Sequence, residues 1–95
     1  MNKSDILNYL KDNREKFKKV YDIEEIGLFG SYARDEATID SDIDIFIKAK
    51  PSFHNIIKAK YQIEKDLGKR VDIIRRHKNI KPFLLKTIYK DLIKC

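Results

Sequence analysis

The alternation of apolar and polar residues along the chain predicts a protein of mixed helices and strands. Helices are expected where apolar residues recur every three or four positions, namely residues 4–20, 31–37, 52–67 and from 82 to about 92. Strands are expected in the shorter apolar or alternating runs, at residues 23–29, 42–48 and 71–74. The predicted order of elements is therefore α-β-α-β-α-β-α.

The ends of these elements carry local signals of their own. Ser4 is a plausible N-cap for the first helix, and Asp5 suits the positive end of its dipole. The helix that begins at Pro51-Ser52 is expected to stop at Gly68. About a dozen residues separate Gly30 from Asp42, a length that permits either a crossover or an antiparallel return. We expect an α/β (α+β) fold: a small mixed sheet, mainly antiparallel, with helices packed on it.

Length and composition narrow the class of protein. The chain has 95 residues, 42% of them hydrophobic and 38% charged, which predicts one folded domain spanning residues 1–95. The single cysteine, Cys95, excludes an internal disulfide framework, and with only two histidines a Cys/His zinc site is excluded as well. No apolar run reaches the roughly 18 residues that span a bilayer, and the charged N-terminus does not resemble a signal peptide. We expect a cytoplasmic protein with no membrane partner.

The formal net charge of +6 favours anionic partners such as nucleotides, nucleic acid or an acidic protein surface. A lysine-rich surface also keeps a small protein soluble, and the basic residues are scattered rather than gathered in one tail. Charge alone therefore does not decide the function.

Two acidic residues on the second predicted strand carry the strongest chemical signal. Asp42 and Asp44 alternate with apolar residues, so both carboxylates lie on one face with Cα atoms about 6.6 Å apart. Two like charges this close need a compensating cation, and a hard divalent ion such as Mg²⁺ suits carboxylate oxygens. Asp72, on the next strand, reaches the same side if the two strands are neighbours. It then either completes the metal site or takes a proton from an attacking hydroxyl.

The turn after the first strand supplies the complementary feature. Gly30 ends a strand and leads into a helical turn, which exposes backbone N–H groups, and the Ser31 hydroxyl adds a donor for phosphate oxygens. Arg34 lies one turn further on, where it can add charge near the phosphates or clamp the loop. Each feature alone is more often an ordinary turn or a charged surface. Their order and spacing together point to a nucleotide site.

This combination resembles a known family. The residues Gly30-Ser31-Tyr32-Ala33-Arg34, then Ser41-Asp42-Ile43-Asp44, then a later strand aspartate, are similar to the DNA polymerase β-like nucleotidyltransferases. The short chain resembles their minimal members, the small prokaryotic nucleotidyltransferases. One departure is visible, because Asp35 stands where the family usually has glycine.

The resemblance implies a site and a reaction. Gly30, Ser31 and Arg34 would bind the nucleoside triphosphate, and the three aspartates, Asp42, Asp44 and Asp72, would be catalytic and hold one or two Mg²⁺ ions. The reaction would transfer AMP from ATP to a hydroxyl, with release of pyrophosphate. Family members of this size commonly act as antitoxins that modify a tyrosine of a HEPN-domain ribonuclease toxin.

Three other readings of the sequence remain open. The protein could neutralise its partner by binding alone, or it could modify a small molecule. A nucleic-acid-binding module is the third, but the chain lacks a helix-turn-helix or an aromatic RNA motif, so nucleic acid is not expected as a direct ligand.

Overall fold

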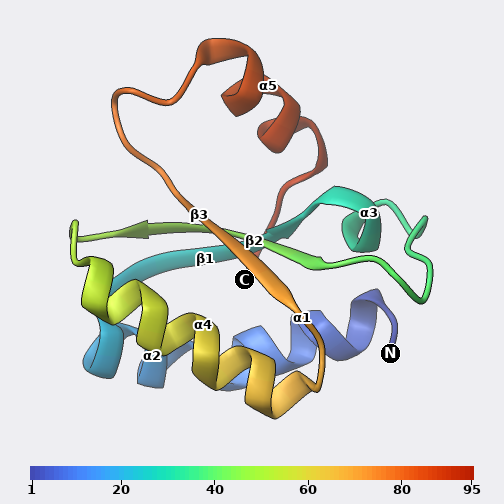
Figure 1. Cartoon of the computed structure of the whole chain (residues 1–95), viewed down its shortest axis with the longest axis horizontal. Coiled ribbons are helices and arrows are strands. Elements are labelled where there is room, and N and C mark those ends of the chain that lie inside the picture. The colour runs from blue at the N-terminus through green and yellow to red at the C-terminus, as the bar shows by residue number, and fades with distance from the viewer.

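A four-stranded mixed sheet forms the centre of the molecule, with strand order β3-β2-β1-β4 (Figure 1). The computed structural model describes all 95 residues. Strand β1 runs antiparallel to β2 and to β4, whereas β2 and β3 are parallel. The strands are β1 (Ile23–Phe29), β2 (Ile43–Ala49), β3 (Val71–Arg75) and β4 (Ile93–Lys94), and the helices are α1 (Lys3–Asp12), α2 (Arg14–Tyr21), α3 (Gly30–Ala33), α4 (Phe53–Leu67) and α5 (Pro82–Asp91). The predicted mixed, mainly antiparallel sheet is confirmed.

One face of the sheet holds the core. The side chains of Ile43, Ile45 and Ile47 are fully buried, and they join a cluster with residues of α1, α2 and α4. These three helices lie on one side of the sheet, and α5 lies on the other (Figure 1). Burial of each large aliphatic side chain contributes roughly 1.5–3 kcal/mol, so this helical layer supplies most of the stability.

The opposite face is more open, and the polar residues of β2 lie on it. Because side chains alternate along a strand, Asp42, Asp44, Phe46 and Lys48 point away from the core. Helix α5 lies over this face, and its Ile88 is fully buried. No helix is long and apolar enough to cross a bilayer.

The predicted first helix, residues 4–20, is two helices rather than one. Asn13 interrupts it: its backbone, with φ of −103° and ψ of 7°, departs from the helical values, and its side-chain amide donates to the Tyr9 carbonyl at 2.9 Å. The N-cap is Asn2 rather than Ser4: the Asn2 side chain accepts from the Asp5 N–H, and the Asp5 carboxylate accepts from the Asn2 N–H. The Ser4 prediction was wrong because a better-placed cap lies two residues earlier.

The fourth strand, β4, was not predicted. Leu92 leaves α5 in an extended conformation, and the next two residues pair with Gly27 and Leu28 of β1. A two-residue strand has no periodicity, and its partner lies far away in the sequence, so no local pattern indicates it.

A hydrogen bond between helices offers a test of the packing of this layer. The Tyr9 hydroxyl of α1 donates to the Asp66 carboxylate of α4 at 2.6 Å, and desolvation together with this carboxylate raises the pKa of Tyr9. We expect Tyr9→Phe to lower the free energy of unfolding by about 1 kcal/mol, the usual net value of such a bond. Urea denaturation measures it, and an unchanged midpoint would show that the bond does not stabilise the fold.

Candidate active site

Asp44 and Gly30 form the centre of the candidate site. Gly30 begins α3 with φ of 77°, a left-handed conformation that glycine adopts without strain. A Cβ atom at this position would overlap Oδ2 of Asp44 and lie 2.9 Å from its Cγ. The Asp44 carboxylate therefore occupies space that exists only because residue 30 has no side chain. The sequence placed these two residues in one site, and the structure brings them into direct contact.

Asp72 lies beside Asp44 on the neighbouring strand. The parallel pairing of β2 with β3 makes Asp44 and Asp72 direct partners in the ladder, so their side chains leave the sheet on the same face. The sequence places Asp72 beside Asp42 and Asp44 only if their strands are neighbours. The structure shows that the strands are neighbours.

The third carboxylate, that of Asp42, stands at the edge of the group. Its Oδ1 lies 3.7 Å from Nε of Arg70, the residue just before β3. In this arrangement the three carboxylates are not placed closely enough to hold a metal ion as a group. Their chemistry nevertheless suits a hard divalent ion, because all three offer oxygen donors from one face of two adjacent strands.

Burial and neighbouring charges perturb the carboxyl of Asp44. Desolvation by burial raises the pKa of its carboxyl, the negative charges of Asp72 and Asp42 raise it further, and nearby Arg34 lowers it. The Asp44 side chain accepts no hydrogen bond that would offset this cost. The site thus holds more negative charge than its own residues neutralise, as expected of a place that receives a cation.

Arg34 ties the glycine turn to α5. Its Nη1 donates to Asp91 at 2.6 Å and its Nε to Glu36 at 3.1 Å, and the Asp91 side chain is only 11% exposed. These two carboxylates raise the pKa of the Arg34 guanidinium. From the sequence, Arg34 could either add charge near the phosphates or clamp the loop; these contacts hold the loop, and its binding of a nucleotide stays a prediction. The hydroxyl of Ser31, the other predicted donor, has no hydrogen-bond partner within the protein.

This ion pair leads to a prediction for the loop. We expect Asp91→Asn to weaken the hold of α5 on Arg34, so that the amides of α3 exchange hydrogen for deuterium faster than in the unmodified protein. Glu36→Gln, which removes only the more exposed partner, should have a smaller effect. Equal protection of α3 in all three proteins would contradict a clamping role.

The departure at residue 35 is accommodated by the backbone. Asp35 has φ of 59°, the left-handed region, and aspartate is among the few residues other than glycine that adopt it readily. Its carboxylate pairs with Lys3 of α1 at 2.9 Å. Aspartate therefore takes the conformation that a glycine would adopt here.

Sequence reasoning missed Arg70 and Asp91, which pair with Asp42 and Arg34. The partner of Arg70 lies 28 positions away in the sequence, and the partner of Asp91 lies 57 positions away. Only the assembled sheet and the placement of α5 bring the partners together, so no local pattern could have found them.

Comparison with known proteins agrees with this geometry. Residues 6–95 match the family described as a nucleotidyltransferase domain. A protein of Methanocaldococcus jannaschii, provisionally described as a protein adenylyltransferase, is 38% identical over 94 residues, which cover 95% of this chain and 94% of that protein. The protein adenylyltransferase MntA of Thermococcus cleftensis is 32% identical over 91 residues, covering 94% of this chain and 91% of its own.

Solved structures show the same fold. A structure provisionally described as a minimal nucleotidyltransferase matches with a TM-score of 0.81 at 24% identity, over 98% of this chain and 95% of that chain. A chain from a crystal structure of a toxin–antitoxin pair with AMP-PNP matches with a TM-score of 0.66 at 24% identity, over 99% of this chain and 72% of its own.

Proposed function

Because this chain belongs to the nucleotidyltransferase domain family, we propose that it transfers AMP from ATP to a tyrosine hydroxyl of a partner protein. The proposed partner is a toxin with a HEPN ribonuclease domain, and the chain would act as its antitoxin in the cytoplasm, where ATP is available. The observation that carries the proposal is the pairing of Asp44 with Asp72 directly beside the Gly30 turn. The names of the relatives, which are protein adenylyltransferases, support a protein acceptor.

In the proposed reaction each residue has a stated task. Asp42, Asp44 and Asp72 would hold one or two Mg²⁺ ions, which supply positive charge to the phosphates when bound. Gly30 and Ser31 would contact the triphosphate, and Arg34 would add positive charge beside it. The acceptor oxygen forms a bond to the α-phosphorus, the bond from that phosphorus to the β-phosphate bridging oxygen breaks, and pyrophosphate leaves. A free oxygen of Asp72 takes the proton of the acceptor hydroxyl.

The proposal is tested by incubating the protein with ATP labelled at the α-phosphate, Mg²⁺ and the protein encoded beside its gene. We expect label on the partner and release of pyrophosphate. Asp42→Ala together with Asp44→Ala should abolish labelling, whereas Asp40→Ala, a change of an exposed acid just before the strand, should not.

The outcome also separates the alternatives. Partner labelling that survives loss of both carboxylates would refute the assigned site. If neither protein labels the partner yet both neutralise it, the chain acts by binding alone. Label on a small molecule in place of the partner would identify a different acceptor.

A further inference from the structure

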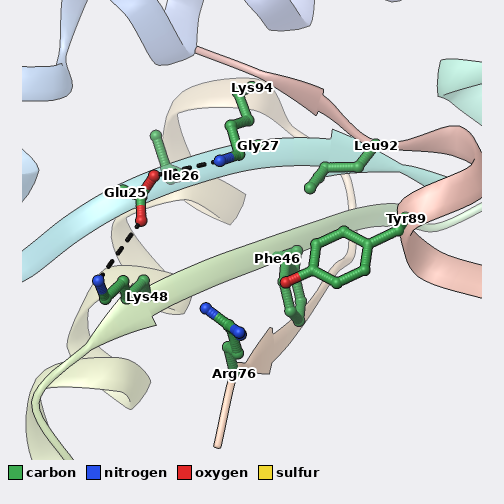
Figure 2. A pocket seen from close by; sticks show the side chains of 9 residues that line it. All are labelled: Glu25, Ile26, Gly27, Phe46, Lys48, Arg76, Tyr89, Leu92 and Lys94. Atoms are coloured by element: carbon green, nitrogen blue, oxygen red, sulfur yellow. Dashed lines mark hydrogen bonds and ion pairs between the residues drawn. The ribbon is translucent and has the colours of Figure 1, made fainter. Parts of the chain in front are cut away.

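A pocket between α5 and the open face of the sheet has no role in the chemistry proposed above. Gly27 and Phe46 form its floor, and Tyr89 and Leu92 of the α5 segment form one wall (Figure 2). A Cβ at Gly27 would lie 2.7 Å from Cδ1 of Leu92 and 2.8 Å from the Ile93 carbonyl oxygen. The Phe46 and Tyr89 rings meet edge to face with centroids 5.8 Å apart. Close packing therefore fixes the position of this wall.

The rim of the pocket carries a surplus of positive charge. Lys48, Arg76 and Lys94 lie on the rim, and Glu25 is the acidic residue that lines the pocket with them (Figure 2). Lys48 also lies 3.9 Å from the Glu24 carboxylate, so three cations face two carboxylates. The Glu25 carboxylate lies 3.9 Å from Nζ of Lys48 and 3.4 Å from Nζ of Lys94. The Arg76 guanidinium has no acidic partner within 4 Å. We call this group the cationic pocket; it has charge to offer an anionic ligand.

The cationic pocket and the three carboxylates lie on the same face of the sheet. From Asp42, just before β2, this face continues along the strand with Asp44, Phe46 and Lys48, so its charge changes from negative to positive. The same change runs along the neighbouring strand from Asp72 to Arg76, whose backbone N–H donates to the Ile47 carbonyl at 2.8 Å and so stays beside Lys48. Lys48 lies four residues beyond Asp44, or about 13 Å along the strand.

We propose that the cationic pocket binds an acidic side chain of the acceptor protein and thereby orients the acceptor with its hydroxyl at Asp72. This inference rests on the proposed function and names the acceptor feature that the site selects. An acidic group is repelled by the carboxylate end of the face and attracted by the other end, so one orientation is favoured. The acidic group would meet the cations of the rim, because the floor residue Phe46 is buried.

The other substrate classes fit the pocket less well. The proposed contacts of the triphosphate, Gly30 and Ser31, lie at the carboxylate end of the face, so the pocket is left for the second substrate. Phe46 is 6% exposed and its ring is packed against Phe29 and Tyr89, so it offers no free face for a nucleic acid base.

The spacing defines which acceptors should bind. A segment in extended conformation advances about 3.3 Å per residue, so a distance of about 13 Å corresponds to four residues. We therefore expect the acceptor to carry Asp or Glu about four residues from the modified tyrosine when that segment is extended.

Two fluorescent peptides test this inference. Each contains one tyrosine within a Gly/Ser sequence, with glutamate four residues away in one peptide and lysine in the other. Fluorescence anisotropy at low ionic strength should show about fivefold tighter binding of the glutamate peptide, with the difference shrinking as salt is added. Arg76→Glu should reverse the preference. Lys86→Glu, the same charge change on the exposed side of α5, should leave it intact.

The remaining outcomes are decisive as well. Equal or undetectable binding of the two peptides, or a preference unchanged by Arg76→Glu, overturns the inference. A single-stranded RNA that binds more tightly than the glutamate peptide and is lost in Arg76→Glu would assign the pocket to nucleic acid. If the glutamate preference and its reversal hold while the unmodified protein transfers AMP to no acceptor, the pocket assignment stands and the proposed reaction fails.

Discussion

Asp44→Asn should abolish AMP transfer and at the same time stabilise the protein. Loss of the central carboxylate is expected to lower the transfer rate about a thousandfold, equivalent to about 4 kcal/mol of transition-state stabilisation. Burial and two neighbouring carboxylates raise the pKa of Asp44, so its ionised form disfavours the folded state above that pKa. Without divalent ions at pH 7, the neutral amide removes this penalty, and the melting temperature should rise by a few degrees, since 1 kcal/mol corresponds to roughly 4–8 °C in a domain of this size.

The pH dependence checks the sign of this effect. As the pH falls through the raised pKa, Asp44 becomes protonated in the folded protein and its penalty disappears, so the advantage of Asp44→Asn over the unmodified protein should shrink. Asp40→Asn, at an exposed position before β2, should change neither the rate nor the melting temperature appreciably. A variant at Asp44 that is less stable at pH 7 would contradict the burial argument. Thermal melts in the presence of a chelator provide the measurement.

Gly30→Ala should damage both stability and catalysis. A residue with a side chain is strained at φ of 77°, and the added Cβ would displace the Asp44 carboxylate from its place over the turn. We expect a loss of about 2–3 kcal/mol in the free energy of unfolding. Transfer should fall about a hundredfold, because a displacement of about 1 Å in a reacting group can have this effect. Urea denaturation and the transfer assay measure the two losses.

Gly68→Ala is the matched control for this substitution. Gly68 also has a left-handed conformation, with φ of 67°, but a Cβ there would meet nothing within 4 Å. It should therefore lose only about 1 kcal/mol of backbone free energy and retain its transfer rate. Similar losses of activity in the two variants would mean that the contact between residue 30 and Asp44 is not what matters.

The sequence predicted correctly those features that depend on the residue pattern of a single strand. Period-two alternation placed Asp42 and Asp44 on the face opposite Ile43 and Ile45, and the structure agrees. The pairing of Asp44 with Asp72 depended on a condition, since strand order is set by packing across the sheet rather than by either strand alone. The sequence alone therefore could not show whether the two strands are neighbours.

Contacts between distant segments could not be predicted. The close approach of Leu92 and Ile93 to Gly27 forms the wall of the cationic pocket, yet Gly27 in the sequence is an unremarked glycine within a strand. The break at Asn13 was missed for a different reason, because apolar residues keep nearly helical spacing across it. The periodicity of apolar residues indicates which side of a helix is buried. It does not indicate at which residue the helix is interrupted.

One face of β2 packs on the helices and the other carries the polar residues, and this arrangement has an evolutionary consequence. Because neighbouring residues of one strand serve opposite faces, and if the cationic pocket binds the acceptor as proposed, a substitution at the exposed Lys48 would change acceptor choice without disturbing the isoleucines that hold the helices. Relatives could thus diverge in target choice while keeping the same scaffold. A single-residue insertion in β2 has no such freedom: it would turn the isoleucines outward and the aspartates inward, losing fold and chemistry together.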